Sequence, residues 1–146
     1  MPTKTFSNLL ALTIVCLVMA GCEKSDETTH YKNIVGCWTK PMYVDNSEGK
    51  SIYCFEKAKS LPNNSGGTKF YNDGTLIERK NSGDCGTPPI AYANFSGNWQ
   101  VQENGDIIID VAYWGGMEHK VWKVIDITNK TLTIEIVLHE NNLTID

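Results

Sequence analysis

The sequence predicts an all-β domain, a single antiparallel up-and-down barrel of about eight strands. Short runs rich in Val, Ile, Tyr, Trp and Thr recur at regular intervals after residue 32, and clusters of Gly, Asn and Asp separate them. This alternation of β-favouring runs with turn residues is typical of antiparallel sandwiches and barrels. The same part of the chain shows no convincing helix pattern.

The turns between the expected strands are clearest in the second half of the chain. The Asn-Asp-Gly run at 72–74 and the Asn-Gly pair at 104–105 are typical of tight hairpins. Gly-Gly at 115–116 and Thr-Asn-Lys at 128–130 separate the next runs. Consecutive hairpins predict a meander. The expected strands are 33–40, 50–56, 67–72, 75–81, 92–102, 106–113, 118–127 and 131–138.

The strand expected over 131–138 alternates most clearly, with Leu132, Ile134, Ile136 and Leu138 on one face and Thr131, Thr133 and Glu135 on the other. One apolar face per strand favours closure into a barrel, because closure removes the exposed edges that invite aggregation. Eight strands leave an interior just wide enough for side chains or for one small ligand.

Two segments, 57–66 and 82–90, are expected to be irregular. Pro62 in the first and two prolines in the second exclude regular ladder pairing. The polar tail at 141–146 is expected either to add a last strand segment or to fray.

The first 21 residues have the features of a secretory signal. Lys4 supplies a positive charge, and an apolar stretch runs from Leu9 to Ala20. This stretch is too short to span a bilayer, which takes about 20 apolar residues in a helix, but it matches a signal peptide. Ala20-Gly21-Cys22 then resembles the bacterial lipobox. The resemblance implies cleavage after Gly21 and attachment of a lipid to Cys22.

The sequence divides into a signal peptide at 1–21, a flexible tether at 22–32 and a barrel domain at 33–146. The tether is expected because 23–29 is polar, acidic and free of apolar residues. Two or more acyl chains give stable membrane anchoring. We therefore expect a lipid-anchored protein of the Gram-negative cell envelope, at the outer membrane, on its periplasmic or surface face.

The charge of the chain argues against nucleic acid as a partner. The 146 residues carry a formal net charge of −4, and removal of 1–21 takes away Lys4 and no acidic residue, which leaves −5. No basic run or clustered Lys/Arg face is present to bind phosphates. After the signal, no apolar stretch is long enough to cross a membrane.

Three of the five cysteines remain for the oxidising compartment, because Cys16 leaves with the signal and Cys22 carries the lipid. We expect a disulfide between Cys54 and Cys85, which lie near turn-rich polar segments, and a buried free thiol at Cys37 in an apolar strand. The pairings Cys37–Cys54 and Cys37–Cys85 remain open. None of the three has the C-x-x-C spacing of redox or zinc motifs.

Several motifs of the domain occur together in one known group of proteins. They are the G-x-W pattern within 33–38, the run 70–75, Gly97-Asn98-Trp99, and the final hairpin from Trp122 to Ile134. Together they resemble the small lipocalin-like lipoproteins of Gram-negative bacteria, and the block 85–90 (Cys-Gly-Thr-Pro-Pro-Ile) looks like that of a largely uncharacterised subgroup. The resemblance covers about 33–138 and implies a lipocalin-like barrel.

Aromatic side chains are the main candidates for a binding site. Trp38, Trp99 and Trp122 are expected to fill the core, which aromatic residues do well. Other aromatic residues are candidates for lining an apolar pocket in the barrel mouth, and Gly115-Gly116 allows close approach to two of them. The ligand-binding candidates are Tyr92, Phe95, Tyr113 and Trp114.

Catalysis is not expected. The chain lacks G-x-S-x-G, H-E-x-x-H and phosphate-loop motifs, and no third partner is suggested near His119 or His139. A metal site would need a cluster that the sequence does not show, so we expect no metal and no cofactor. The scattered acids Glu78, Asp106, Asp110 and Glu118 are interpreted as solvated strand faces.

Two functions are therefore expected. The first is binding of a small apolar or amphipathic ligand in the barrel of an anchored envelope lipoprotein. The alternative is a solid barrel that binds a protein partner through the Cys85–Ile90 loop. Two prolines make this loop rigid, and a rigid loop loses less ordering entropy on binding; it is equally a candidate for capping the barrel.

Overall fold

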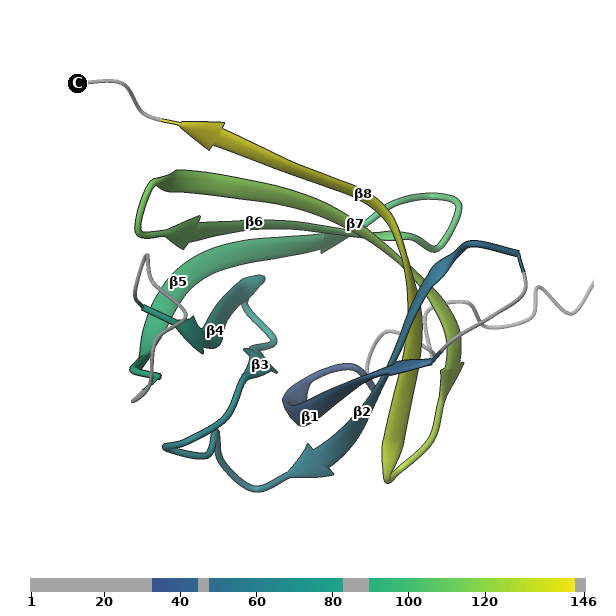
Figure 1. Ribbon diagram of the computed structural model, residues 1–146. Helices are drawn as coiled ribbons and strands as arrows, with labels where there is room; N and C mark the ends of the chain where they lie inside the picture. The colour runs from purple at the N-terminus through teal and green to yellow at the C-terminus, as the bar shows by residue number, and fades with distance from the viewer. Residues whose placement is uncertain (1–32, 45–47, 83–89, 144–146) are drawn as a thin grey trace, which may run out of the picture.

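The structure is a computed structural model that describes residues 33–44, 48–82 and 90–143, with side chains described as far as Asn141. These residues form a closed, antiparallel, eight-stranded barrel (Figure 1). Within the described ranges no helix is long and apolar enough to cross a membrane. The predicted all-β barrel is confirmed. Its strands are β1 (Gly36–Val44), β2 (Ser51–Ala58), β3 (Gly67–Phe70), β4 (Thr75–Asn81), β5 (Tyr92–Val101), β6 (Ile107–Tyr113), β7 (Gly116–Ile127) and β8 (Thr131–Leu143).

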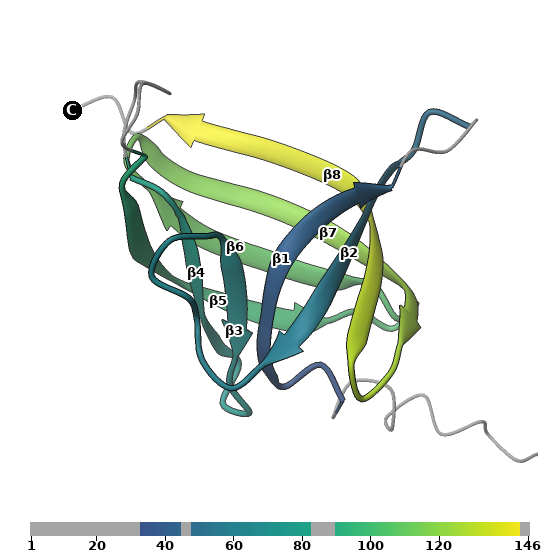
Figure 2. The same ribbon diagram turned by 60° about the horizontal axis from the view of Figure 1, so that its bottom comes forward.

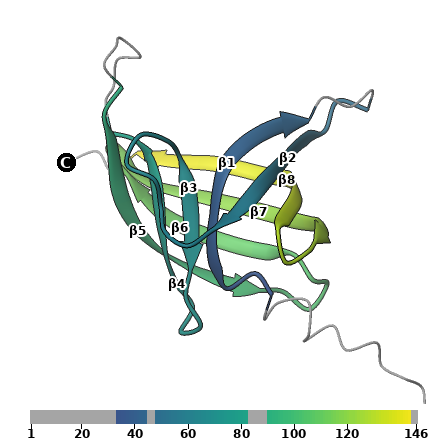
Figure 3. The same cartoon turned by 90° about the horizontal axis from the view of Figure 1, so that it is seen from below.

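The strands follow chain order around the barrel except at one crossover. From β3 to β8 each strand pairs with the next, as the hairpin turns predicted. β1 instead lies between β2 and β3, and the barrel closes where β2 meets β8. The irregular segment 59–66 makes this arrangement possible, because it carries the chain from β2 across β1 to β3 (Figure 3).

Two glycines permit close approach between neighbouring strands. A Cβ on Gly67, the first residue of β3, would lie 2.6 Å from the carbonyl oxygen of Trp38 in β1. A Cβ on Gly97 would collide with the backbone of Asp110 and Val111 in β6. Any larger residue at either position would push the paired strands apart.

The first and last strands run further than predicted. β1 continues past residue 40 to Val44 because a register shift between Thr39 and Met42 accommodates Pro41, and Lys40 takes a φ of 53°. β8 continues past residue 138 to Leu143, paired with the first residues of β7. The polar tail therefore adds a strand segment over 141–143.

The hydrophobic core occupies one end of the barrel. Trp38 is fully buried, and its indole Nε1 donates a hydrogen bond to the carbonyl oxygen of Ile34 at 2.6 Å. The ring of Trp122 lies 5.5 Å from that of Phe55 and 5.9 Å from that of Phe70. Trp99 packs against this cluster while partly exposed. The expected core role is confirmed for Trp38 and Trp122, whereas Trp99 lies at the edge of the core. The buried core is Ile34, Trp38, Phe55, Phe70, Leu76, Ile107, Ile109, Val111, Trp122, Leu132 and Ile134.

Candidate functional site

The two ends of the barrel differ in what fills them. The closed end holds the tryptophan core, and the turns 71–74 and 128–130 lie there, at the bottom of Figure 2. The mouth is the opposite end, where the β1–β2 hairpin and the end of β8 lie. The side chains that face inward between these two ends are mainly charged and aromatic.

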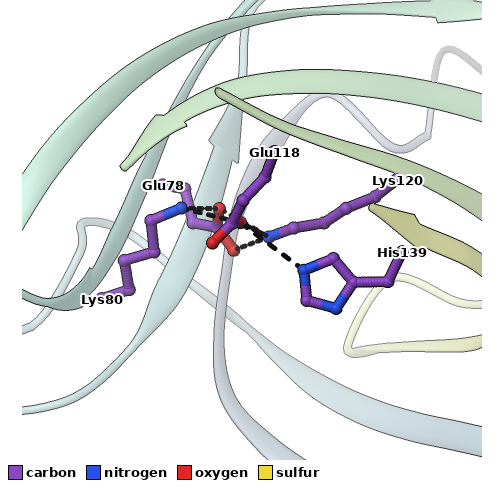
Figure 4. A network of polar contacts seen from close by, with 5 residues as sticks. All are labelled: Glu78, Lys80, Glu118, Lys120 and His139. Carbon is purple, nitrogen blue, oxygen red and sulfur yellow. Dashed lines mark hydrogen bonds and ion pairs between the residues drawn. The ribbon is translucent and has the colours of Figure 1, made fainter. Parts of the chain in front are cut away.

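The charged side chains form an ionic cluster of Glu78 and Lys80 from β4 with Glu118 and Lys120 from β7 (Figure 4). Lys120 Nζ lies 2.8 Å from Glu78 Oε1 and 2.7 Å from Glu118 Oε2. Lys80 Nζ lies 3.1 Å from Glu78 Oε2 and 2.8 Å from Glu118 Oε2. Each lysine thus contacts both carboxylates, and the cluster has no net charge.

Strand alternation places all four side chains inside the barrel. Residues two apart in a strand share a face, so Glu78 and Lys80 face the same way as buried Leu76. Glu118 and Lys120 likewise share the face of buried Trp122. β5 and β6 lie between β4 and β7 in the sheet, so the ion pairs connect two separate walls of the barrel.

The cluster is well shielded from solvent. The exposed fractions of its side chains are 9% for Lys120, 12% for Glu118, 16% for Glu78 and 20% for Lys80. His139 of β8 is paired with Lys120 in the strand register, and its Nε2 lies 4.0 Å from Glu118 Oε2. Its side chain is 47% exposed, so the solvent exposure of the charged side chains increases toward the mouth.

Ion pairing outweighs burial in two members of the cluster. Burial by itself lowers the pKa of Lys120, but the charges and hydrogen bonds of Glu78 and Glu118 shift the pKa above its ordinary value. Burial likewise raises the pKa of Glu118, while hydrogen bonds from Lys120 and Lys80 bring the pKa below its ordinary value. Both groups therefore stay charged over the neutral pH range.

An aromatic wall adjoins the ionic cluster. Lys80 Nζ lies 5.1 Å from the ring centroid of Phe95 and 6.0 Å from that of Tyr113, within the range of cation–π attraction. The ring of Tyr113 is 5.8 Å from that of Trp114. A Cβ on Gly115 would lie 2.7 Å from Tyr113 Cε2, so only glycine leaves room for this ring position.

Two buried donor atoms beside the cluster lack a hydrogen-bond partner among the described residues: the hydroxyl of Tyr113 and the indole Nε1 of Trp122. Trp122 is 3% exposed and lies two residues from Lys120 on the inward face of β7. Tyr113 lies two residues from buried Val111, so it belongs to the inward face of β6. Buried polar groups usually find partners, and these two stand out for that reason.

The structure brings together part of the predicted ligand-binding set. Phe95 and Tyr113 both lie against Lys80, and Trp114 contacts Tyr113 while its own side chain is 63% exposed. Tyr92 is three residues from Phe95 in the same strand and therefore belongs to the opposite face of β5. Only three of the four predicted aromatic residues thus come together at the mouth.

The interpretation of Glu78 and Glu118 as solvated strand faces was wrong. Both face the barrel interior and pair with lysines there. The sequence carries a signal for this, a repeated Glu-x-Lys at 78–80 and 118–120, which strand alternation places on one face. Asp110 does lie on the outside, where its Oδ1 is 2.7 Å from His119 Nδ1 and its side chain is half exposed. Asp106, in the turn before β6, is partly exposed.

The cysteine predictions are met only in part. Cys37 is a buried free thiol, as expected, and burial raises its pKa. Cys54 is a free thiol as well, so the disulfide expected at Cys54 is not formed in this structure, and Cys37 and Cys54 are not bonded to each other. Cys85 itself lies outside the described residues. Cys22 and all but Ile90 of the Cys85–Ile90 loop also lie outside them.

The described part of the chain contains no group of three or more His, Cys, Asp or Glu side chains arranged to hold a metal ion. Comparison with protein-family models, with curated proteins and with solved structures returned no match to this chain.

Proposed function

We propose that this protein is a lipid-anchored barrel of the bacterial envelope that binds a small amphipathic ligand in its mouth. The observation that carries the proposal is the exposure of inward-facing side chains near the mouth. His139 is paired with inward-facing Lys120, yet its side chain is 47% exposed. Tyr43 packs against inward-facing Tyr53 and is 53% exposed. In a barrel filled along its whole length such side chains would be buried.

The chemistry of the mouth favours an amphipathic ligand over a wholly apolar one. The closed end is already filled by Trp38, Trp122 and their neighbours, so it offers no place for a long apolar chain. Phe95 and Tyr113 can hold the apolar part of a ligand, and the polar groups beside them can hold the rest. Ligand sites commonly combine an apolar wall with a few placed polar groups.

The anchor in this proposal is the lipid on Cys22. The described chain begins at Asn33, at the closed end of the barrel, and the carbonyl oxygens of Asn33 and Val35 accept hydrogen bonds from Lys57 Nζ at 3.4 Å. The proposed tether of 22–32 therefore leaves from the end opposite the mouth. A barrel held in this way presents its mouth to the surrounding compartment.

A protein-interaction role is the second candidate. Trp114 is 63% exposed and Ile90 is 49% exposed, and both lie in connections at the mouth. Large exposed aromatic residues are enriched at protein interfaces. On this proposal the same rim, with the Cys85–Ile90 loop, contacts a protein partner instead of a ligand.

Native mass spectrometry of the protein extracted gently from membranes distinguishes ligand binding from protein interaction. Ligand binding predicts a population whose mass exceeds that of the lipidated chain by one small molecule. That population should disappear when Phe95 is replaced by Glu, and it should persist in Trp114→Ala. Loss of a co-purifying protein in Trp114→Ala, with no added small mass in the unchanged protein, would instead support the interaction role.

The anchor is tested separately. Cys22→Ser is expected to release the protein from the membrane fraction or to leave an unprocessed precursor. Cys54→Ser is the matched control and should stay in the membrane fraction. A Cys22→Ser protein of normal mature size that still fractionates with membranes would show that the anchor is wrong.

A further inference from the structure

We infer that the polar head of the ligand is uncharged and offers hydrogen-bond acceptor oxygens, as an ester or an amide does. The inference rests on the proposed ligand-binding function and names the class of ligand. It follows from the charge balance of the ionic cluster and from the two donors that have no partner beside it.

The charge balance of the cluster disfavours an ionic head group. Both lysines contact both carboxylates, at 2.7 to 3.1 Å, so no charge is left over within Glu78, Lys80, Glu118 and Lys120. A carboxylate or ammonium head brought beside them would add one uncompensated charge. Burial of an unpaired charge is costly, and the ligand would also have to compete with contacts that are already short.

The unpartnered donors favour an acceptor. Tyr113 Oη and Trp122 Nε1 are buried without a hydrogen-bond partner in the described chain. The indole N–H can only donate, and the phenol can donate as well as accept. A buried donor left without a partner destabilises the protein, so a ligand that supplies a carbonyl or ether oxygen would provide the missing hydrogen-bond acceptor.

Both donors belong to the inner wall of the barrel. Tyr113 lies at the mouth end of β6, with its ring near Lys80 and Trp114. Trp122 lies deeper, in contact with Phe55 and Phe70 of the core. A ligand with its oxygen toward Tyr113 would keep its apolar part against Phe95, which packs on the same core.

The test uses three probes with the same alkyl chain: octanamide, octanoate and octylammonium. The mature chain is held in lipid nanodiscs, protein-free nanodiscs serve as the blank, and binding is followed by tryptophan fluorescence at pH 7. We expect octanamide to bind at least about tenfold more tightly than either ion, because each ion adds a charge to a balanced cluster. Equal or tighter binding of either ion would overturn the inference and leave the proposed function standing.

Tyr113→Phe tests the donor directly. Loss of the hydroxyl should weaken octanamide binding by about tenfold, while the melting temperature stays the same or rises, because an unpartnered buried group is removed. A structural role alone would lower the melting temperature and leave the affinity unchanged. Tyr71→Phe, in the turn at the closed end, is the matched control and should change neither quantity.

The indole N–H signal of Trp122 in a nitrogen–proton NMR spectrum, assigned by Trp122→Phe, gives a second readout. It should shift on addition of octanamide. Unchanged octanamide affinity in Tyr113→Phe, together with an unmoved Trp122 signal, would overturn the assignment of both donors. If none of the three probes binds and native mass spectrometry finds no small molecule, the proposed ligand-binding function itself fails.

Discussion

The closed end and the middle of the barrel use the same strand geometry with opposite chemistry. At the closed end, inward side chains are mainly Trp, Phe, Leu and Ile, and the charged contact there is Lys57 Nζ, 4.6 Å from the ring centroid of Trp38. Two and four residues away from Leu76 in β4 and from Trp122 in β7, the inward positions hold Glu and Lys. Apolar burial stabilises a fold directly, whereas a buried ion pair contributes little net stability. The closed end therefore contributes most of the stability, and the proposed function assigns the ionic cluster to ligand recognition.

The largest effect is expected from breaking the closed end. Trp38→Ala removes a fully buried ring and its hydrogen bond to Ile34, and should lower the free energy of unfolding by about 3–5 kcal/mol. Urea denaturation measures the change. Tyr43→Ala, at the exposed mouth, is the control and should cost much less. Similar losses in both variants would contradict the division into a solid end and an open end.

Breaking the ionic cluster should cost nearly as much. Lys120→Met leaves Glu78 and Glu118 to share Lys80 alone, and should lower the free energy of unfolding by about 3 kcal/mol. Joint replacement of Lys120 and Glu118 by Met and Leu removes a whole pair, and should cost clearly less than Lys120→Met alone. A double variant that is as unstable as the single one would mean that the cluster stabilises the fold in its own right.

The pH dependence of stability should reflect the same cluster. The pKa of Glu118 is lowered in the folded protein, so its contribution is present above the unfolded pKa of about 4.3 and is lost as the pH falls through the folded pKa. The pKa of Lys120 is raised, so its contribution is present below about pH 10.4 and is lost as the pH rises through the folded pKa. Thermal unfolding across this range should show a plateau between the two losses, and Glu118→Gln should reduce the acid loss. If the stability of Glu118→Gln falls equally steeply at acid pH, carboxylates other than Glu118 cause the loss.

The smallest effect is expected from an ion pair on the outside of the barrel. Asp110→Asn disrupts the contact between Asp110, whose side chain is 50% exposed, and His119, whose side chain is 31% exposed. Exposed pairs contribute about 0–1 kcal/mol, so the free energy of unfolding should change by less than about 1 kcal/mol. The same denaturation experiment as for Lys120→Met makes the inside and outside pairs directly comparable. A loss as large as that of Lys120→Met would remove the distinction between them.

The strands were predictable because their signals are local. Turn residues such as those at 72–74 and 128–130, together with period-two alternation in β8, act within a few residues of the chain, so all eight strands were located. The position of β1 between β2 and β3 was not predictable, because it depends on the path of the irregular segment 59–66 from β2 to β3. Nothing within that segment encodes the strand that it passes.

The site was only partly predictable for a related reason. Phe95 and Tyr113 were predicted as aromatic residues that could line a pocket, and both lie against Lys80 of the ionic cluster. Glu78 and Glu118 were assigned to solvent because the sequence alone does not show which charged residues of other strands lie beside them. The partners across the barrel are separated by 38 residues for Lys80 and Glu118 and by 42 residues for Lys120 and Glu78.

By itself the sequence determined that this chain forms eight antiparallel strands and that Trp38 and Trp122 belong to the core, because alternation and turn chemistry are properties of neighbouring residues. Only the tertiary structure decided that Glu78, Lys80, Glu118 and Lys120 meet. Closure of the barrel brings β4 and β7 to face each other across its interior. Charges are acceptable in that interior only because the closure also supplies a partner for each of them.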